Sequence, residues 1–395
     1  MPVLTADVAS LLGESWNNVR RSALERAKSA PFPTPEEEVW RYSRISELSI
    51  EEFSPAACPS TVAAENIPAG VTITKVARGE ALPDGVRTDL FDSSNHDRAS
   101  LFDDLNLALM DVVIVSTKAH TVFEQAIIVT HDLSEQGAAY FPRLVIDAGE
   151  NSEVTVVERF VSPDGCRLLV VPALDVRTAK AARVKYLGIN ELGDASWEIA
   201  SQQSSGDRDS DTLLATVALG GDYARVSTSA RLVGQAGNTR QIAIYFTGGE
   251  QMHDFRTCQE HAAPKTTSDL LFKGAIQDQA KSVYTGLIKI HKEAKGSSAF
   301  QTNRNLTLSK GAWAESVPNL DIETNDVKCS HASTVGPIDE DQLFYLESRG
   351  IHPDVAERLV VLGFFDEVLD QLPVGGLAVG LRKKVADKLS IGAES

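Results

Sequence analysis

A cysteine and a histidine lie two residues apart in NDVKCSHASTVG, which covers residues 325–336. Side chains at positions i and i+2 of a strand share one face, so Cys329 and His331 would stand about 6.6 Å apart on that face. A thiolate and a neutral imidazole are ligands for soft metal ions and iron–sulfur clusters. Lys328 could favour the thiolate. Cys329 and His331 are therefore candidate ligands for a metal ion or cluster.

Two observations weigh against this interpretation. Val327 would share the same strand face, so the row could be ordinary core, and free cysteine is among the most buried residue types. The pair also supplies only two ligands, whereas a closed metal site normally has four. A metal role would need further ligands from distant residues or from a partner. The pair is either half of a shared site or part of the core.

The remaining cysteines and histidines form no recognisable motif. The four cysteines are far apart and lack CxxC or zinc-finger spacing, which argues against a disulfide scaffold; they are Cys58, Cys166, Cys258 and Cys329. The segment QMHDFRTCQEHAAP contains His253, Cys258 and His261 at a spacing that fits no standard zinc pattern. We expect turn or core roles there.

Sequence motifs for nucleotide binding and hydrolysis are missing. KGAIQDQAKSV resembles a phosphate loop, but five residues follow Gly274 and Ala280 stands where the second glycine belongs. The sequence also lacks a GxSxG elbow, an HExxH pair and a dinucleotide fingerprint. No tightly bound cofactor is expected for the isolated chain.

The composition is that of a globular protein with an acidic surface. The 395 residues include 43% apolar and 24% charged residues, with a net charge of −17. Such a charge argues against binding of nucleic acid or anionic membranes. The N-terminus lacks the basic start and apolar run of a signal peptide, and no apolar run is long enough to span a bilayer. We expect a cytoplasmic protein.

The elements that must position Cys329 and His331 are strands. Short β-rich runs broken by Gly, Asp and Asn extend from about 111 to 335. GDYARV, DQAKSV and GAWAESV each place a turn residue shortly before an alanine, which suits tight corners stacked on one another. Helical periodicity does not interrupt this region, which excludes a βαβ fold. A parallel β-helix is expected first, and a large sandwich second.

Helical segments flank the strands. Residues 1–30 have helical periodicity, a second helix is expected from Thr34, and residues 51–110 read as loops with some strand. Three helices are expected within 336–395, the first capped by Asp339 and ended by Gly350, the second entered at Pro353. They could dock a partner or cap the end of the solenoid. Their candidate docking residues are Leu343, Leu346, Leu359, Leu362 and Phe365.

Several long segments resemble the SufB/SufD family of iron–sulfur cluster assembly proteins. NDVKCSHASTVGPIDEDQLFYLESRGI resembles its C-terminal signature, EEVWRYSRISEL its N-terminal Trp-Arg-Tyr segment, and residues 258–290 and 301–331 its core. SufB proteins carry a Glu-His-Glu-like run and a further upstream cysteine, whereas Cys-Ser-His at 329–331 is the SufD form.

The resemblance implies a central right-handed parallel β-helix at 111–335 between helical ends. It implies a non-catalytic scaffold subunit that pairs with a SufB-type paralogue, while its terminal helices bind a SufC-type ATPase. A transient iron–sulfur cluster or iron would sit at the interface with SufB, with His331 contributing and Cys329 beside it. Cys258 and His261 receive no role from the resemblance.

Two other classes of protein stay open. One is a polysaccharide-acting β-helix enzyme, although such enzymes are mostly secreted. The other is a structural solenoid that self-associates, for instance as a homodimer through its strand edges, with the Cys-x-His pair incidental.

Overall fold

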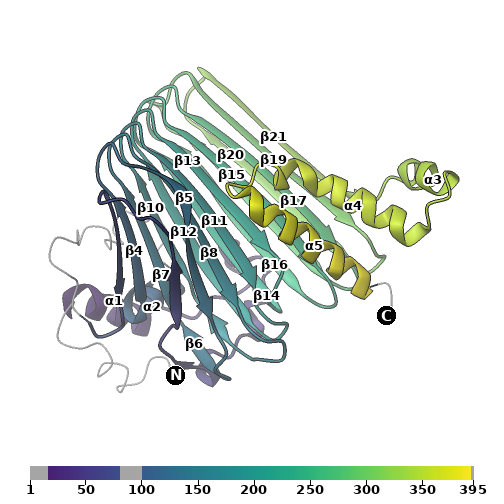
Figure 1. Ribbon diagram of the computed structural model, residues 1–395, viewed down its shortest axis with the longest axis horizontal. Coiled ribbons are helices and arrows are strands. Elements are labelled where there is room, and N and C mark those ends of the chain that lie inside the picture. The colour runs from purple at the N-terminus through teal and green to yellow at the C-terminus, as the bar shows by residue number, and fades with distance from the viewer. Residues whose placement is uncertain (1–16, 81–99, 393–395) are drawn as a thin grey trace.

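The chain forms a parallel β-solenoid of about eight turns with helices at both ends of the sequence (Figure 1). The computed structural model describes residues 17–80 and 100–392. Successive strands alternate between two sheets, so each turn contributes a strand to both. The predicted fold class is confirmed. In the described part of the chain, we find no helix long and apolar enough to cross a membrane.

The first sheet contains twelve strands. Its main path is β20 (Trp313–Ile322), β18 (Lys281–Ile290), β16 (Met252–His261), β14 (Tyr223–Leu232), β12 (Trp197–Gly206), β10 (Ala173–Thr178), β7 (Pro142–Ala148), β4 (Asp111–Thr117) and β3 (Val71–Val76). Three short strands join it at the side, namely β1 (Ser54–Pro55), β6 (Ala138–Tyr140) and β9 (Leu169–Val170).

The second sheet stacks against the first. Its order is β2 (Ser60–Ala63), β5 (Val122–Asp132), β8 (Glu153–Val161), β11 (Arg183–Glu191), β13 (Asp211–Ala218), β15 (Asn238–Thr247), β17 (Thr267–Ile276), β19 (Ser297–Thr307) and β21 (Val327–Pro337). The pairs β2–β5 and β3–β4 are antiparallel, so the connecting region before β4 closes the N-terminal end of the solenoid.

Corner residues set the repeat. Tyr223 pairs with Met252 and Met252 with Lys281, a repeat of 29 residues. The corner before β14 contains Gly221 at φ 86°, and the corner before β18 contains Asp278 at φ 56°. Glycine and aspartate tolerate this left-handed backbone better than most residues. The turn residues in GDYARV and DQAKSV therefore do mark stacked corners.

Amino-terminal elements cover the outer face of the first sheet. They are α1 (Asn17–Ser29), α2 (Leu101–Leu109) and three 3₁₀ helices at Glu38–Trp40, Ile45–Glu47 and Ile50–Glu52. The expected helix from Thr34 is wrong, because the chain there bends at Tyr42, φ 67°, to lie flat on the strands. Helix α2 lies in a region expected to be loop and strand; Ser100 and Asp103 cap it reciprocally.

A buried arginine fixes this amino-terminal layer to the solenoid. Arg225 on β14 pairs with Asp254, and its guanidinium lies 4.0 Å from the centre of the Trp40 ring. It also donates to the Val39 carbonyl. A buried charge is tolerated when it is paired and hydrogen-bonded in this way. The conspicuous Trp-Arg-Tyr segment thus has a packing role.

Three helices follow the solenoid, and the second and third of them cover the outer face of the second sheet (Figure 1). They are α3 (Glu340–Ser348), α4 (Pro353–Leu369) and α5 (Gly375–Gly392), and their predicted starts at Asp339 and Pro353 are confirmed. Phe365 packs against Ile242 and Ile244, while Lys273 donates to the Phe364 carbonyl at 2.8 Å. Helices α4 and α5 lie along the side of the solenoid and leave its last turn uncovered, whereas α3 projects away from it (Figure 1).

Candidate functional site

The last turn of the solenoid is open. Strands β20 and β21 lie at the ends of their sheets, each with a strand neighbour on one side within the described chain. Their interior-facing side chains therefore lack the next turn that would cover them. Leu320 is 43% exposed, Ile322 38% and Val335 43%. Exposed apolar side chains beside unpaired strand edges favour pairing with another chain.

Cys329 and His331 belong to this uncovered interior row. In the parallel register Cys329 pairs with Ala299 and His331 with Gln301, both of which are buried and point into the solenoid. Cys329 is half-buried against the cluster that contains Ile288 and Ile290, whereas His331 is exposed. Both side chains therefore face inward at an end that nothing in the described chain closes.

The position of Val327 now has an explanation. It does share the interior face with Cys329, as an ideal strand requires, and it packs on the same cluster. The row nevertheless remains accessible because the solenoid ends there. In the middle of a solenoid, residues on the interior face are buried. At the end of the solenoid, residues on the same face can remain accessible.

The open end does not by itself supply a complete set of metal ligands. Partial burial raises the pKa of the Cys329 thiol, so this sulfur needs a metal ion or a positive neighbour to become a thiolate ligand. Within residues 17–80 and 100–392, no three His, Cys, Asp or Glu side chains converge as a metal site. The pair can supply at most part of a coordination shell.

A second exposed surface lies on α3 and the start of α4. Phe344 is 72% exposed, Tyr345 58% and Leu359 47%. A shallow pocket there is lined by Asp341, Gln342, Tyr345, Leu346 and Val360. Aromatic side chains around such a pocket are typical of docking surfaces.

The expected docking residues separate into two groups. Leu346 and Leu359 lie at this exposed surface. Leu343 and Leu362 are partly buried against the cluster that joins α4 and α5 to the second sheet, and Phe365 is fully buried in it. The helical spacing that grouped them did not reveal which side of α4 packs on the sheet. Phe365 attaches α4 to the solenoid and offers no exposed contact.

His253, Cys258 and His261 do not form a site. The two histidines are buried, and Cys258 points to the opposite side of β16 by strand alternation. His261 contacts Thr266 Oγ1 at 2.7 Å and Ser268 Oγ at 2.8 Å. Burial lowers the pKa of His253 to about 3 and that of His261 to about 4. The expected core roles agree with this arrangement.

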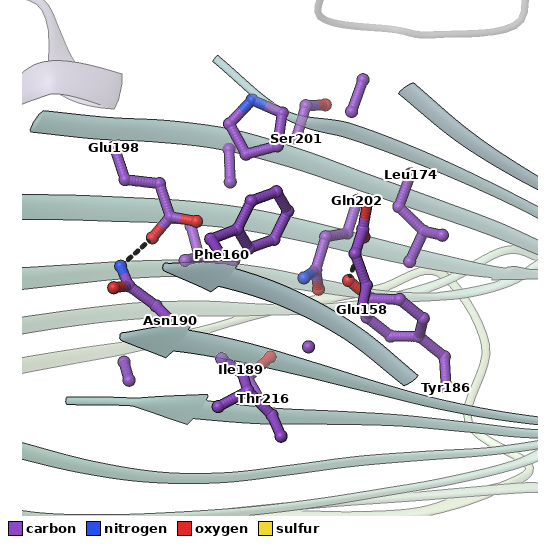
Figure 2. A pocket seen from close by; sticks show the side chains of 16 residues that line it. Glu158, Phe160, Leu174, Tyr186, Ile189, Asn190, Glu198, Ser201, Gln202 and Thr216 are labelled. Atoms are coloured by element: carbon purple, nitrogen blue, oxygen red, sulfur yellow. Dashed lines mark hydrogen bonds between the residues drawn. The ribbon is translucent and has the colours of Figure 1, made fainter. Parts of the chain in front are cut away.

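Sequence reasoning missed a buried polar group in the early turns. Glu158 and Glu198 line an internal cavity, where Tyr186 donates to Glu158 and Asn190 to Glu198 (Figure 2). Burial raises the pKa of Glu198 to about 7. Residues one repeat apart stack in a solenoid; Glu158 stacks on Gly188, and Tyr186 lies two positions before that glycine on the same face, so strand register was the available signal.

Fold and geometry together define a β-solenoid protein whose open end carries an accessible cysteine–histidine pair. Residues 128–364 match the model of the SUF system FeS cluster assembly, SufBD core domain. An iron–sulfur cluster assembly SufBD family protein of Mycobacterium tuberculosis is 31% identical over 99% of this chain and 97% of its own length. The chain therefore belongs to the SufB/SufD family of iron–sulfur cluster assembly proteins.

Within the family the chain is similar to SufD. The iron–sulfur cluster assembly protein SufD of Escherichia coli is 30% identical over 63% of this chain and 59% of its own length. That of Bacillus subtilis is 32% identical over 60% of this chain and 55% of its own length. These relatives support a role in SUF iron–sulfur cluster assembly.

Proposed function

We propose that this chain is a non-catalytic scaffold subunit of SUF iron–sulfur cluster assembly. It pairs through its open end with a SufB-type paralogue, and a nascent cluster or iron ion is held as cargo at that junction. His331 supplies one ligand, and Cys329 beside it a second. The observation that carries this proposal is the inward-facing, uncovered position of both side chains on β21.

Pairing of solenoid ends follows from the physics of edges. A second β-solenoid would continue the hydrogen-bond ladders of β20 and β21 and bury Leu320, Ile322 and Val335. Closing the junction would also remove water from Cys329 and His331. Partner ligands would then complete a coordination shell that this chain leaves half-filled.

The exposed surface of α3 and α4 is the proposed docking site for a SufC-type ATPase. Removing everything after residue 336 would be a poor test, because it would strip α4 and α5 from the sheet and expose Ile242, Ile244 and Phe246. Replacing Phe344 and Tyr345 by serine leaves that packing intact. The matched control is Val379→Ser, an apolar residue of α5 that is 70% exposed.

Co-expression with SufB-type and SufC-type partners tests the proposal. The complex is purified without oxygen, and its iron, sulfide and ATPase activity are compared with those of this chain alone. We expect partners to co-purify, iron and sulfide to appear only in the complex, and the Phe344/Tyr345 double variant to lose the ATPase. A chain that co-purifies with neither partner would contradict the proposal.

Self-association is the second candidate, since a second copy of this chain could also cover the open end. The same exposed residues, Leu320 and Ile322, favour it. Light scattering of the purified chain alone and with the SufB-type partner separates the two. A homodimer that persists in excess partner would favour a structural solenoid without a cluster role.

A further inference from the structure

A second cysteine–histidine pair lies near the opposite end of the solenoid. Cys58, between β1 and β2, places its Sγ 3.4 Å from Nδ1 of His131 on β5. On the far side of the ring, His131 Nε2 lies 2.9 Å from Oε1 of Glu158 on β8. Glu158 Oε2 accepts a hydrogen bond from Tyr186 at 2.7 Å. Thiol, imidazole and carboxylate are thus connected in series.

The imidazole is held rigidly. His131 is 1% exposed and Glu158 2%. The ring of Phe160 stacks on the His131 ring with centres 5.0 Å apart and planes inclined by 19°. With Nε2 directed to Glu158 and the ring clamped, Nδ1 can point only toward the segment that contains Cys58 and Ser60. Ser60 Oγ lies 2.8 Å from the same Nδ1 and competes for it.

The thiol is held from its own side and remains accessible. The Cys58 backbone N–H donates to Asp111 Oδ2 at 2.9 Å, and the Cys58 side chain is half-buried. Asp111 also pairs with Arg78, a buried guanidinium whose charge interacts with that of Cys58. Cys58 thus lies between two positively charged groups, Arg78 and the His131 imidazole when it is protonated.

The charge state of the imidazole suits this arrangement. Burial alone would lower the pKa of His131, but hydrogen bonds and charges from Cys58 and Glu158 raise it to about 10. At neutral pH the ring therefore carries a proton that can be shared with the sulfur. A protonated histidine beside a cysteine is the arrangement that makes a cysteine nucleophilic.

The geometry points to an activated-thiol site at Cys58 that exchanges with low-molecular-weight disulfides. His131 touches the reacting sulfur and Glu158 acts through His131 as a positioning residue. This inference does not depend on the role of the open end, because β5 and β21 lie near opposite edges of the second sheet.

The exchange step balances without another reactant. The Cys58 thiolate attacks one sulfur of an R–S–S–R′ bond, so a bond from Sγ to that sulfur forms while the original S–S bond breaks. Its electron pair leaves on the second sulfur, which takes the proton held by His131. Cys58 is oxidised to a mixed disulfide and the leaving group is reduced to a thiol.

Disulfides fit this site better than acyl substrates do. Acyl transfer needs hydrogen-bond donors preorganised for an oxyanion. The groups fixed around Cys58 are instead a carboxylate, Asp111, and a guanidinium already paired with it. Thiol–disulfide exchange puts the developing charge on sulfur and requires only an accessible, activated thiol.

The test uses the reduced full-length chain and 4,4′-dithiodipyridine between pH 6 and 8, with each cysteine followed by peptide mass mapping. An ordinary thiol slows about tenfold for each unit by which pH falls below its pKa. We expect the Cys58 rate to change by less than about threefold over this range, with Cys258 and Cys329 as internal comparators. A Cys58 rate that falls as steeply as theirs would overturn the inference.

Two variants assign the roles. Glu158→Gln keeps the hydrogen-bonding shape but removes the charge, so the pH profile of Cys58 should become steep. Ser60→Ala removes the competitor for Nδ1 and should leave the profile flat. If Glu158→Gln folds, as checked by circular dichroism, and keeps a flat profile, Glu158 is not a positioning residue. If it does not fold, the wild-type profile alone decides.

Discussion

The molecule contains two cysteine–histidine pairs that differ in how far the chain completes them. His131 is enclosed and contacts Cys58, Ser60 and Glu158 within hydrogen-bonding distance. His331 lies on an inward-facing row that stops at the end of the solenoid and is exposed to water. The same residue types thus form an internal hydrogen-bond network in one place and an exposed pair at the end of the solenoid in the other. The position of each pair along the solenoid decides whether its side chains are enclosed or exposed.

The largest expected difference between the pairs concerns stability. His131→Ala leaves Glu158 as a buried carboxylate with Tyr186 but without its cationic partner, and such losses cost about 3–5 kcal/mol. His331→Ala removes an exposed side chain and should change the free energy of unfolding by less than about 0.5 kcal/mol. Urea denaturation of both variants measures these changes in the free energy of unfolding. Similar losses would mean that the open end is not open in solution.

Association through the open end is the next largest effect. Ile322→Asp places a charge on the interior-facing row that a partner would bury, at a cost of about 2–5 kcal/mol, or roughly 30-fold or more in affinity. Asn319→Asp adds the same charge on the outer face of the same strand and should change little. Affinity for the SufB-type partner is measured for both. Equal weakening would place the interface elsewhere.

Alkaline pH should remove the contribution of His131 to the free energy of unfolding. The folded-state pKa of His131, about 10, lies above the unfolded value near 6.5. Its stabilisation is therefore fully present below pH 6.5 and is lost as pH rises through 10. The stability difference between wild type and His131→Gln should shrink over that range. A constant difference would contradict the assigned charge state.

A small effect on stability is expected at Cys329. This half-buried sulfur packs against Ile288 and Ile290, so Cys329→Ser should cost about 1 kcal/mol or less in the isolated chain. Thermal unfolding measures the change, and Ser330→Ala on the outer face is the control. A loss comparable to that of His131→Ala would show that Cys329 is a core residue.

Local signals in the sequence were sufficient for much of the fold. The helix starts at Asp339 and Pro353 could be predicted because caps act through neighbouring atoms. Stacked corners were visible because Gly221 and Asp278 each meet a left-handed backbone requirement. The family resemblance to SufB/SufD proteins, which rested on long contiguous segments, is confirmed over residues 128–364.

The features that the sequence could not predict depend on contacts between residues that are far apart along the chain. The segment after Thr34 has helical caps, but Trp40 packs on Arg225, almost two hundred residues away, and this contact overrides the local preference. Cys58 and His131 are 73 residues apart, so no spacing rule joins them. The open end also could not be predicted, because the sequence did not show whether the helices after residue 336 cap the last turn or pack along the side of the solenoid.

The central claim is that His331, with Cys329, completes a cluster site at the junction with a SufB-type partner. The most direct test is the iron and sulfide content of the complex, purified without oxygen, with His331→Ala or Ser330→Ala in this chain. We predict that His331→Ala leaves the complex assembled but removes most of the iron and sulfide, while Ser330→Ala retains both. Full iron and sulfide in an intact His331→Ala complex would contradict the account.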